Sequence, residues 1–144
     1  MNKDKNPKDI VGSKKAPLST IPANVLMEVG LAMLEGSLKY GRHNYRATDV
    51  RASVYYDACQ RHIMDWWEGE DIDKKSQIHH VTKAIAGLIV LRDAIMQDKF
   101  IDDRPPVTKD ADWLEKLNKK AEEMIERCRA PKSPYIKENE ERNS

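Results

Sequence analysis

The stretch from Tyr55 to Asp93 holds the side chains of this chain that are best suited to chemistry. It is dense in acidic, basic and imidazole groups, namely Arg61, His62, Glu68, Glu70, Asp71, Asp73, His79, His80, Lys83 and Asp93. Several of these groups fall at helical spacings that direct them toward a protein interior. Because a buried charge costs free energy unless it is paired or bound to a metal ion, the stretch is the first candidate for a site.

The carboxylates can be interpreted in two ways. Glu28 and Glu35 lie seven residues apart, so they share one helix face at the edge of an apolar arc, with Lys39 on the same line. They can hold Mg²⁺, which prefers carboxylate and water oxygens, or they can form a solvated flank with a Glu35–Lys39 ion pair. The acidic turn around Glu70 and Asp73 either needs a cation to relieve repulsion or is solvated, with Asp73 capping a helix.

The imidazoles and one lysine lie on or beside apolar stripes. His62 stands between Cys59 and Trp66, where a histidine is either a satisfied core residue or a ligand. Lys83 lies next to a stripe that contains His80, and its ammonium can reach a phosphate or extend into solvent.

A glycine lies on that same stripe. Gly87 costs about 1 kcal/mol relative to alanine inside a helix, which predicts close packing at this position.

The segment from Lys39 to Arg46 is rich in cations and aromatic rings. Its sequence KYGRHNYR is typical of a loop that binds a nucleotide or a nucleic acid. The whole chain of 144 residues, however, has a net charge of only +1, so no general basic field favours a stable nucleic-acid partner.

The sequence contains no long apolar run of the kind that crosses a membrane or forms a signal peptide. We therefore expect no membrane association and a cytoplasmic location, in the host if the chain is phage-encoded. Cys59 and Cys128 fit no zinc spacing, and we expect both to be reduced core thiols.

The hydrophobic periodicity predicts an all-α protein without strands. Helices are expected over residues 22–40, 50–68, 77–97 and 110–129, with a polar loop over residues 41–49 and Asp73 or Ser76 capping the third helix. The third helix should be the most buried, and the fourth has a narrow apolar stripe suited to a rim or a subunit contact. We expect a flexible segment 1–16, one helical catalytic domain 17–129, a tail 130–144, and a homo-oligomer, a dimer or higher.

Several separated motifs occur in an order that resembles a known family. They are Lys39-Tyr40-Gly41 with Asn44, Arg61-His62, Gly69-Glu70 with Asp73 and Ser76, and then His80. This order is similar to that of the phage dATP/dGTP diphosphohydrolases, which include the MazZ enzymes and are related in activity to MazG-like all-α pyrophosphohydrolases. The resemblance covers about residues 12–106.

The chain also departs from the family pattern. Gln77 stands where the family often has glycine, and Lys83 stands where many members have a second histidine. The adjacent-glutamate signature of MazG is absent from the first predicted helix, so the MazG ligands cannot be transferred one by one.

The resemblance implies a MazG-like bundle of three core helices plus a C-terminal rim helix. It also implies Mg²⁺- or Mn²⁺-dependent conversion of a purine deoxynucleoside triphosphate, dGTP or dATP, to the monophosphate and pyrophosphate. In phage nucleotide metabolism this reaction serves pool control or the synthesis of a 2-aminoadenine genome.

On this interpretation the metal ligands are Glu28, Glu35, Glu70 and Asp73, and we expect Glu35 and Asp73 to converge on one ion. The catalytic candidates are His62, His80 and Arg61. The substrate-binding candidates are Lys39, Asn44, Tyr45, Arg46 and Lys83.

Two alternatives from other classes stay open. An HD-type phosphohydrolase would use the ligand types offered by His62, His79, His80 and Asp93, although the sequence has no His-Asp dyad. A non-catalytic helical adaptor or nucleic-acid module would instead use the loop from Lys39 to Arg46 as a phosphate clamp.

Overall fold

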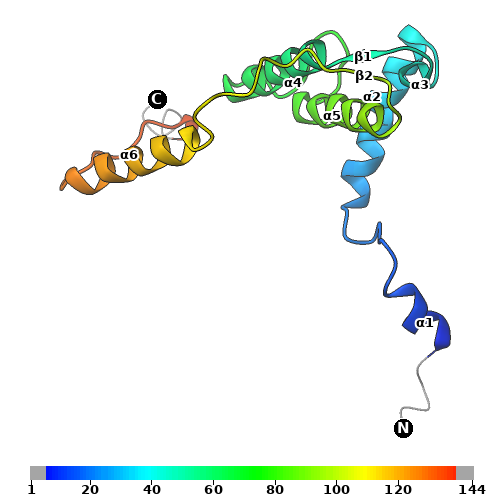
Figure 1. Cartoon of the computed structure of the whole chain (residues 1–144), viewed down its shortest axis with the longest axis horizontal. Helices are drawn as coiled ribbons and strands as arrows, with labels where there is room; N and C mark the ends of the chain where they lie inside the picture. Colours follow the sequence, from blue (N-terminus) through cyan, green and yellow to red (C-terminus); the bar gives the residue numbers. More distant parts are fainter. Residues whose placement is uncertain (1–5, 139–144) are drawn as a thin grey trace. The chain divides into compact units, whose positions relative to one another are not determined.

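The computed structural model describes residues 6–138, and residues 1–5 and 139–144 lie outside the described part. The chain divides into two compact units, Met1–Arg104 and Pro105–Ser144 (Figure 1). The first unit contains α1 (Pro7–Gly12), α2 (Ala23–Tyr40), α3 (Asn44–Ala47), β1 (Val50–Arg51), α4 (Ala52–Trp67), α5 (His80–Met96) and β2 (Phe100–Ile101). The second contains α6 (Trp113–Arg127). The predicted all-α class is confirmed, and the single domain over residues 17–129 stays a prediction.

Helix α5 is the centre of the first unit, as the sequence predicted. It packs against α2, α3, α4 and β2. The side chains that it buries are mostly small, namely His80, Thr82, Ala84, Ala86 and Ala94. Its larger apolar residues Leu88 and Ile89 stay 49% and 41% exposed. The apolar run therefore predicted a buried helix correctly, but the small residues form the packed face.

The contact between α4 and α5 depends on Gly87. A Cβ atom placed on Gly87 would lie only 2.7 Å from Sγ of Cys59, so the predicted close packing at this glycine is confirmed. The Cys59 thiol is buried and donates a hydrogen bond to the Ala84 carbonyl over 3.5 Å.

Cys128 is exposed, so its prediction as a core thiol was wrong. It lies just after α6, which buries none of its residues.

Two short strands pair in parallel: β1 precedes α4, and β2 follows α5. Val50 pairs with Phe100 and Arg51 pairs with Ile101, so the prediction of no strands was wrong and α4 begins two residues later than expected. The strand pair positions Asp103 beside the first turn of α4. There its carboxylate accepts hydrogen bonds from the Ser53 amide over 2.8 Å and from the Ser53 hydroxyl. The helix is therefore capped by a residue that is distant in sequence.

The segment between α4 and α5 is a structured turn. Asp73 accepts hydrogen bonds from the amides of Lys75 and Ser76, each over 3.3 Å, and from the Ser76 hydroxyl over 2.6 Å. Because Gln77 has a left-handed φ of 62°, the chain cannot continue as a helix there. Helix α5 instead begins at His80, with the His79 ring accepting from the Val81 amide. The prediction that Asp73 or Ser76 caps this helix was wrong.

The segments outside this core differ from the expectations in detail. The predicted flexible segment 1–16 contains α1, which begins where the Asn6 side chain accepts from the Lys8 amide and which buries no residue. The predicted polar loop over residues 41–49 contains the single turn α3.

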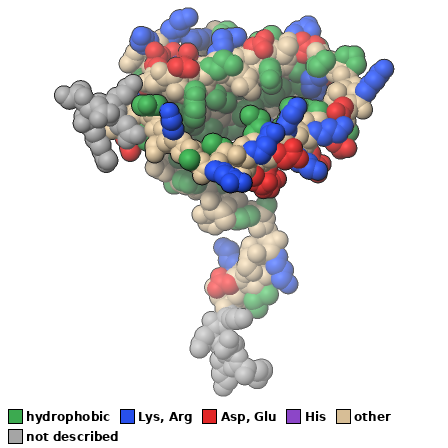
Figure 2. Space-filling model, turned by 90° about the vertical axis from the view of Figure 1, so that its left-hand side faces the viewer, with side chains coloured by type: hydrophobic (Ala, Val, Ile, Leu, Met, Phe, Trp, Pro, Cys, Tyr) green, Lys and Arg blue, Asp and Glu red, His purple; other side chains and the backbone are tan. Residues whose placement is uncertain are grey.

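In the described part of the chain, no helix is long and apolar enough to cross a membrane. Figure 2 shows one face of the molecule, on which charges of both signs are mixed with hydrophobic side chains.

We predict that Gly87 and Cys59 are energetically coupled. Gly87→Ala gains about 1 kcal/mol of helix propensity. It also forces a methyl group against Sγ, and overpacking of this kind costs about 1–3 kcal/mol. In a Cys59→Ala background the collision is removed, so Gly87→Ala should be more favourable there than in the wild type. Urea unfolding of the four proteins measures the coupling, and additive effects would contradict the packing argument.

Candidate functional site

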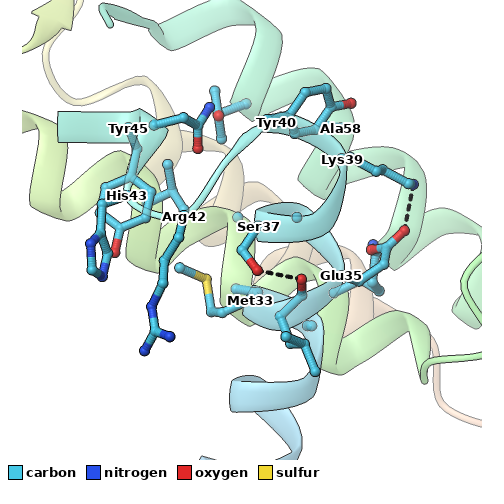
Figure 3. Close-up of a pocket in the computed structure, with 18 of the residues that line it drawn as sticks. Met33, Glu35, Ser37, Lys39, Tyr40, Arg42, His43, Tyr45 and Ala58 are labelled. Atoms are coloured by element: carbon cyan, nitrogen blue, oxygen red, sulfur yellow. Dashed lines mark hydrogen bonds and ion pairs between the residues drawn. The ribbon is translucent and has the colours of Figure 1, made fainter. Parts of the chain in front are cut away.

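A cleft of about 750 Å³ is lined by residues of α2, the following loop, α3, α4 and α5 (Figure 3). Residues of α2 and α4 form much of its lining, and Lys83, Ala86, Gly87 and Val90 contribute the part from α5. The cleft brings together predicted site residues from four segments, namely Glu35, Lys39, Asn44, Tyr45, His62 and Lys83.

The charged part of the cleft is organised around Glu35. Its carboxylate accepts hydrogen bonds from the ammonium groups of Lys39, one turn later on α2, and of Lys83 on α5. Burial opposes the charged form of Glu35, but the two lysines outweigh it and lower the pKa of this carboxyl. The pKa of Lys39 is raised, mainly by its hydrogen bond to Glu35. The predicted Glu35–Lys39 pair is thus present, with Lys83 as a second cation.

Beside this group, two histidines and a carboxylate form a chain of hydrogen bonds. Nδ1 of His62 lies 2.8 Å from Nδ1 of His80, and Nε2 of His80 lies 2.9 Å from Oε1 of Glu70. An ionised carboxylate can only accept, so Nε2 of His80 donates to Glu70. When the His80 ring is neutral, its Nδ1 accepts the proton of His62 Nδ1. His62, which lines the cleft, then has an Nε2 that can accept a hydrogen bond.

Burial, hydrogen bonds and neighbouring charges shift the pKa values of the groups in this chain. Burial, followed by the charge of His80, lowers the pKa of His62, while the charge of Asp73 opposes the shift. The hydrogen bond from His80 lowers the pKa of Glu70, so Glu70 is the charged acceptor of the chain. The charge of Asp73 also contributes to the raised pKa of Lys39, after the larger effects of Glu35. Asp73 is therefore within electrostatic reach of the cleft.

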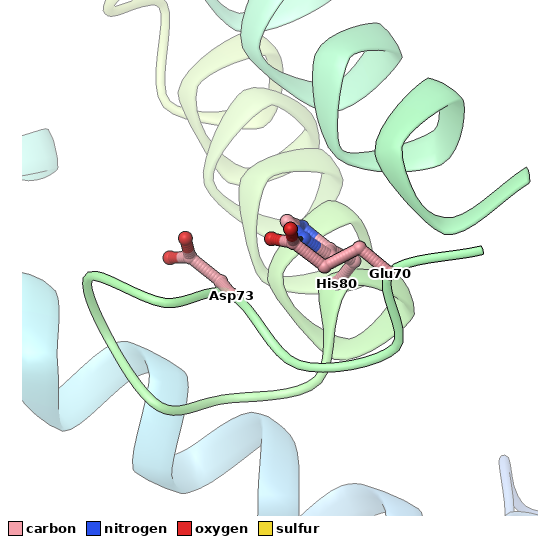
Figure 4. A group of neighbouring side chains, drawn as sticks. All are labelled: Glu70, Asp73 and His80. Atoms are coloured by element: carbon pink, nitrogen blue, oxygen red, sulfur yellow. Dashed lines mark hydrogen bonds and ion pairs between the residues drawn. The ribbon is translucent and has the colours of Figure 1, made fainter. Parts of the chain in front are cut away.

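Glu70, Asp73 and His80 form the group of the described residues that can hold a metal ion. Their ligand atoms lie within 4.8 Å of one another, on the turn before α5 and at its first residue (Figure 4). Both nitrogens of His80 already take part in hydrogen bonds, so the two carboxylates are the readier ligands. Oxygen ligands of this kind suit Mg²⁺ or Mn²⁺.

The other predicted metal ligands are not in this group. Glu28 accepts a hydrogen bond of 2.6 Å from the Thr82 hydroxyl, and Glu35 is held by its two lysines. The structure therefore does not bring Glu35 and Asp73 into one compact ligand set. Their convergence on one ion would require Glu35 to exchange at least one lysine for the metal, and it stays a prediction.

Two predicted cationic residues lie away from the cleft lining. Arg46 makes a bidentate pair with Asp93 on α5, with N–O distances of 3.1 and 2.9 Å, and so fixes α3 to α5. Arg61 is on an exposed position of α4.

The sequence analysis left Tyr40, Arg42, His43 and Tyr55 out of the candidate site residues, but all four line the cleft. The signal for the first three was present in the KYGRHNYR segment.

An all-α fold with a cleft that combines two lysines paired to one carboxylate, histidines and aromatic rings defines a class of protein suited to nucleotide phosphates. Residues 5–104 match the family described as dATP/dGTP diphosphohydrolase, N-terminal, and the chain belongs to this family. The family resemblance is thereby confirmed.

One curated relative gives a second comparison. A dATP/dGTP diphosphohydrolase of Salmonella phage PMBT28 is 31% identical over 90 residues, which cover 62% of this chain but only 30% of the relative. The chain thus matches less than a third of the length of that relative. No solved structure matches the chain.

We predict that the Arg46–Asp93 pair makes stability depend on pH in the acid range. The hydrogen bond from Arg46 lowers the pKa of Asp93 below 3.8. This contribution is therefore present above the ordinary pKa of the carboxyl and is lost as pH falls through the lowered value. Arg46→Gln should reduce the free energy of unfolding at pH 7 and have progressively less effect toward pH 3.

Urea unfolding at a series of pH values measures this difference. Arg42→Gln is the matched control, because Arg42 forms no ion pair with a carboxylate among the described residues. An effect of Arg46→Gln that is the same at every pH would contradict the assignment.

Proposed function

We propose that this chain hydrolyses a purine deoxynucleoside triphosphate, dGTP or dATP, at the α–β phosphoanhydride. The oxygen of a water molecule would bond to the α-phosphorus, the bond from that phosphorus to the bridging oxygen would break, and the products would be the monophosphate and pyrophosphate. The observation that best supports the proposal is the cleft in which Lys39 and Lys83 lie beside Glu35 and the His62–His80–Glu70 chain. Membership of the diphosphohydrolase family and the name of the phage relative support it further.

The cations of the cleft are suited to a triphosphate. Lys39 and Lys83 share one carboxylate, so their two positive charges exceed the single negative charge of Glu35. Phosphate oxygens can take over the hydrogen bonds that Glu35 now accepts, and charge neutralisation is the main requirement of phosphoryl transfer. This exchange would also free Glu35 to approach a metal ion.

Glu70 and Asp73 would hold Mg²⁺ or Mn²⁺, with His80 as a further ligand or as the donor that orients Glu70. A bound divalent ion would supply polarisation of the α-phosphoryl group and a lower pKa for the attacking water. His62 can position that water by accepting a hydrogen bond at Nε2, while its Nδ1 is fixed by His80. His80, only 1% exposed, would act as a positioning residue.

A direct assay tests the reaction and its alternatives. The protein is incubated with each of the common deoxynucleoside triphosphates and Mg²⁺ or Mn²⁺, and the products are separated by ion-exchange chromatography. Monophosphate and pyrophosphate would support the proposal, whereas nucleoside and triphosphate would indicate the HD-type reaction. Salt-sensitive nucleic-acid binding without turnover would favour the non-catalytic module.

The proposal extends to biological setting and assembly. The reaction would serve phage nucleotide metabolism in the host cytoplasm, through pool control or a 2-aminoadenine genome pathway.

Homo-oligomerisation is suggested by the apolar side chains of α6, because Leu117 and Met124 stay 55% and 59% exposed. Sedimentation velocity checks this: Leu117→Glu should lower the mass of the particle, whereas Lys119→Glu, on the opposite side of α6, should not. A monomer at every concentration would exclude the oligomer.

We predict that Lys83 is required for turnover and not for folding. Lys83→Met keeps the aliphatic stem and removes the charge, so kcat/KM should fall strongly while the helical circular dichroism is unchanged. Lys83→Arg should restore little, because the guanidinium fork is wider than an ammonium. If Lys83 merely extends into solvent, both variants will hydrolyse the substrate at nearly the wild-type rate.

We predict that Asp73 contributes to metal affinity. Asp73→Asn removes a charged ligand, so Mn²⁺ affinity measured by electron paramagnetic resonance in the absence of nucleotide should fall about tenfold or more. Asp71→Asn is the matched control, since Asp71 lies on the same turn but is exposed and outside the ligand group. Equal losses in both variants would indicate a general charge effect and remove Asp73 from the site.

A further inference from the structure

The loop that closes one side of the cleft is held in a strained but fixed conformation. Gly41 and His43 have left-handed φ angles of 93° and 65°, and a non-glycine residue in this region costs free energy. The Arg46–Asp93 pair fixes the end of the loop to α5. The Thr48 amide and hydroxyl both donate to the Asn44 carbonyl, over 2.9 and 3.0 Å. The segment is therefore organised before any ligand binds.

This loop supplies flat rings to the cleft. The rings of His43 and Tyr45 are 6.3 Å apart in an edge-to-face arrangement, and both residues line the cleft with Tyr40 and Tyr55 (Figure 3). Aromatic side chains bind nucleobases by stacking, but stacking hardly discriminates between bases because each presents a π-face. Selection between bases therefore needs a polar group that can reach a base edge.

Asn44 is suited to this task. Among the described residues that line the cleft, it is the only carboxamide, and the only lining carboxylate, Glu35, is occupied by two lysines. A carboxamide has an acceptor oxygen and a donor nitrogen, and rotation by half a turn exchanges their places. Adenine presents a donor at N6 beside an acceptor at N1, whereas guanine presents an acceptor at O6 beside a donor at N1. One asparagine can therefore pair with either purine.

We propose that Asn44 reads the base edge of the bound purine nucleotide, and that rotation of its amide allows the same residue to accept adenine and guanine. The inference rests on the proposed function for the choice of ligand. Arg46 then acts as a positioning residue, which holds the reading residue in place through Asp93 and does not contact the base.

Asn44→Asp is the decisive variant. An aspartate can accept two hydrogen bonds from N1–H and the N2 amino group of guanine, but it has no donor for N1 of adenine. The dGTP-to-dATP affinity ratio should therefore rise about tenfold or more, the usual value of one bidentate base contact. Asn44→Ala should weaken both nucleotides and leave the ratio near the wild-type value.

Affinities are measured by calorimetry with Mg²⁺ and the α,β-methylene analogues of dATP and dGTP, which the proposed reaction cannot cleave. Asn24→Asp is the matched control, because Asn24 does not line the cleft and the substitution adds the same charge. An unchanged ratio in Asn44→Asp, an equal change in Asn24→Asp, or a wild type that binds neither analogue would overturn the inference. A shifted ratio in a protein that releases no pyrophosphate from dGTP or dATP would overturn the hydrolysis alone.

Discussion

The close approach of α4 and α5 is the constraint on which the site depends. The absence of a side chain at Gly87, the small Cys59 and the alanines on the packed face of α5 allow the two helices to approach. Only at this separation can His62 of α4 reach His80 of α5 over 2.8 Å. Larger core residues would bury more apolar surface, but they would separate the imidazoles and leave His80 as a buried polar group without its partner. Packing and site geometry are thus set by the same residues.

The carboxylates of the site all have hydrogen-bond partners before any ligand arrives. Glu35 has its two lysines, Glu70 has His80, and Asp73 has the donors of its own turn. No buried side-chain polar atom among the described residues lacks a hydrogen-bond partner. A highly charged ligand therefore binds by exchanging existing partners, and its affinity is the difference between two sets of interactions. This arrangement stabilises the free protein and reduces the cost of holding cations near a cleft.

The sequence predicted the long helices and much of the cleft, because both follow from local pattern. Periodicity and Gly41 placed α2 within a residue, and the motif residues Lys39, Asn44, His62 and Lys83 do line the cleft. Contacts between distant segments were not predictable in this way. The pairing of Val50 with Phe100 involves strands of two residues, which are too short for an alternating pattern. The Arg46–Asp93 pair and the pairing of Glu35 with two lysines depend on how α5 packs against the other elements. The spacing of residues along the chain does not predict that packing.

The cap that Asp103 provides for α4 has a consequence for how the protein can be rearranged. This carboxylate reaches Ser53 from 50 residues later, and the first compact unit ends one residue further on, at Arg104. The unit is therefore closed by the last part of its own sequence, and a ribosome must complete the segment to Asp103 before α4 can be capped. The cap uses no residue beyond Arg104, so the sequence after Arg104 can change in length or content without removing the cap.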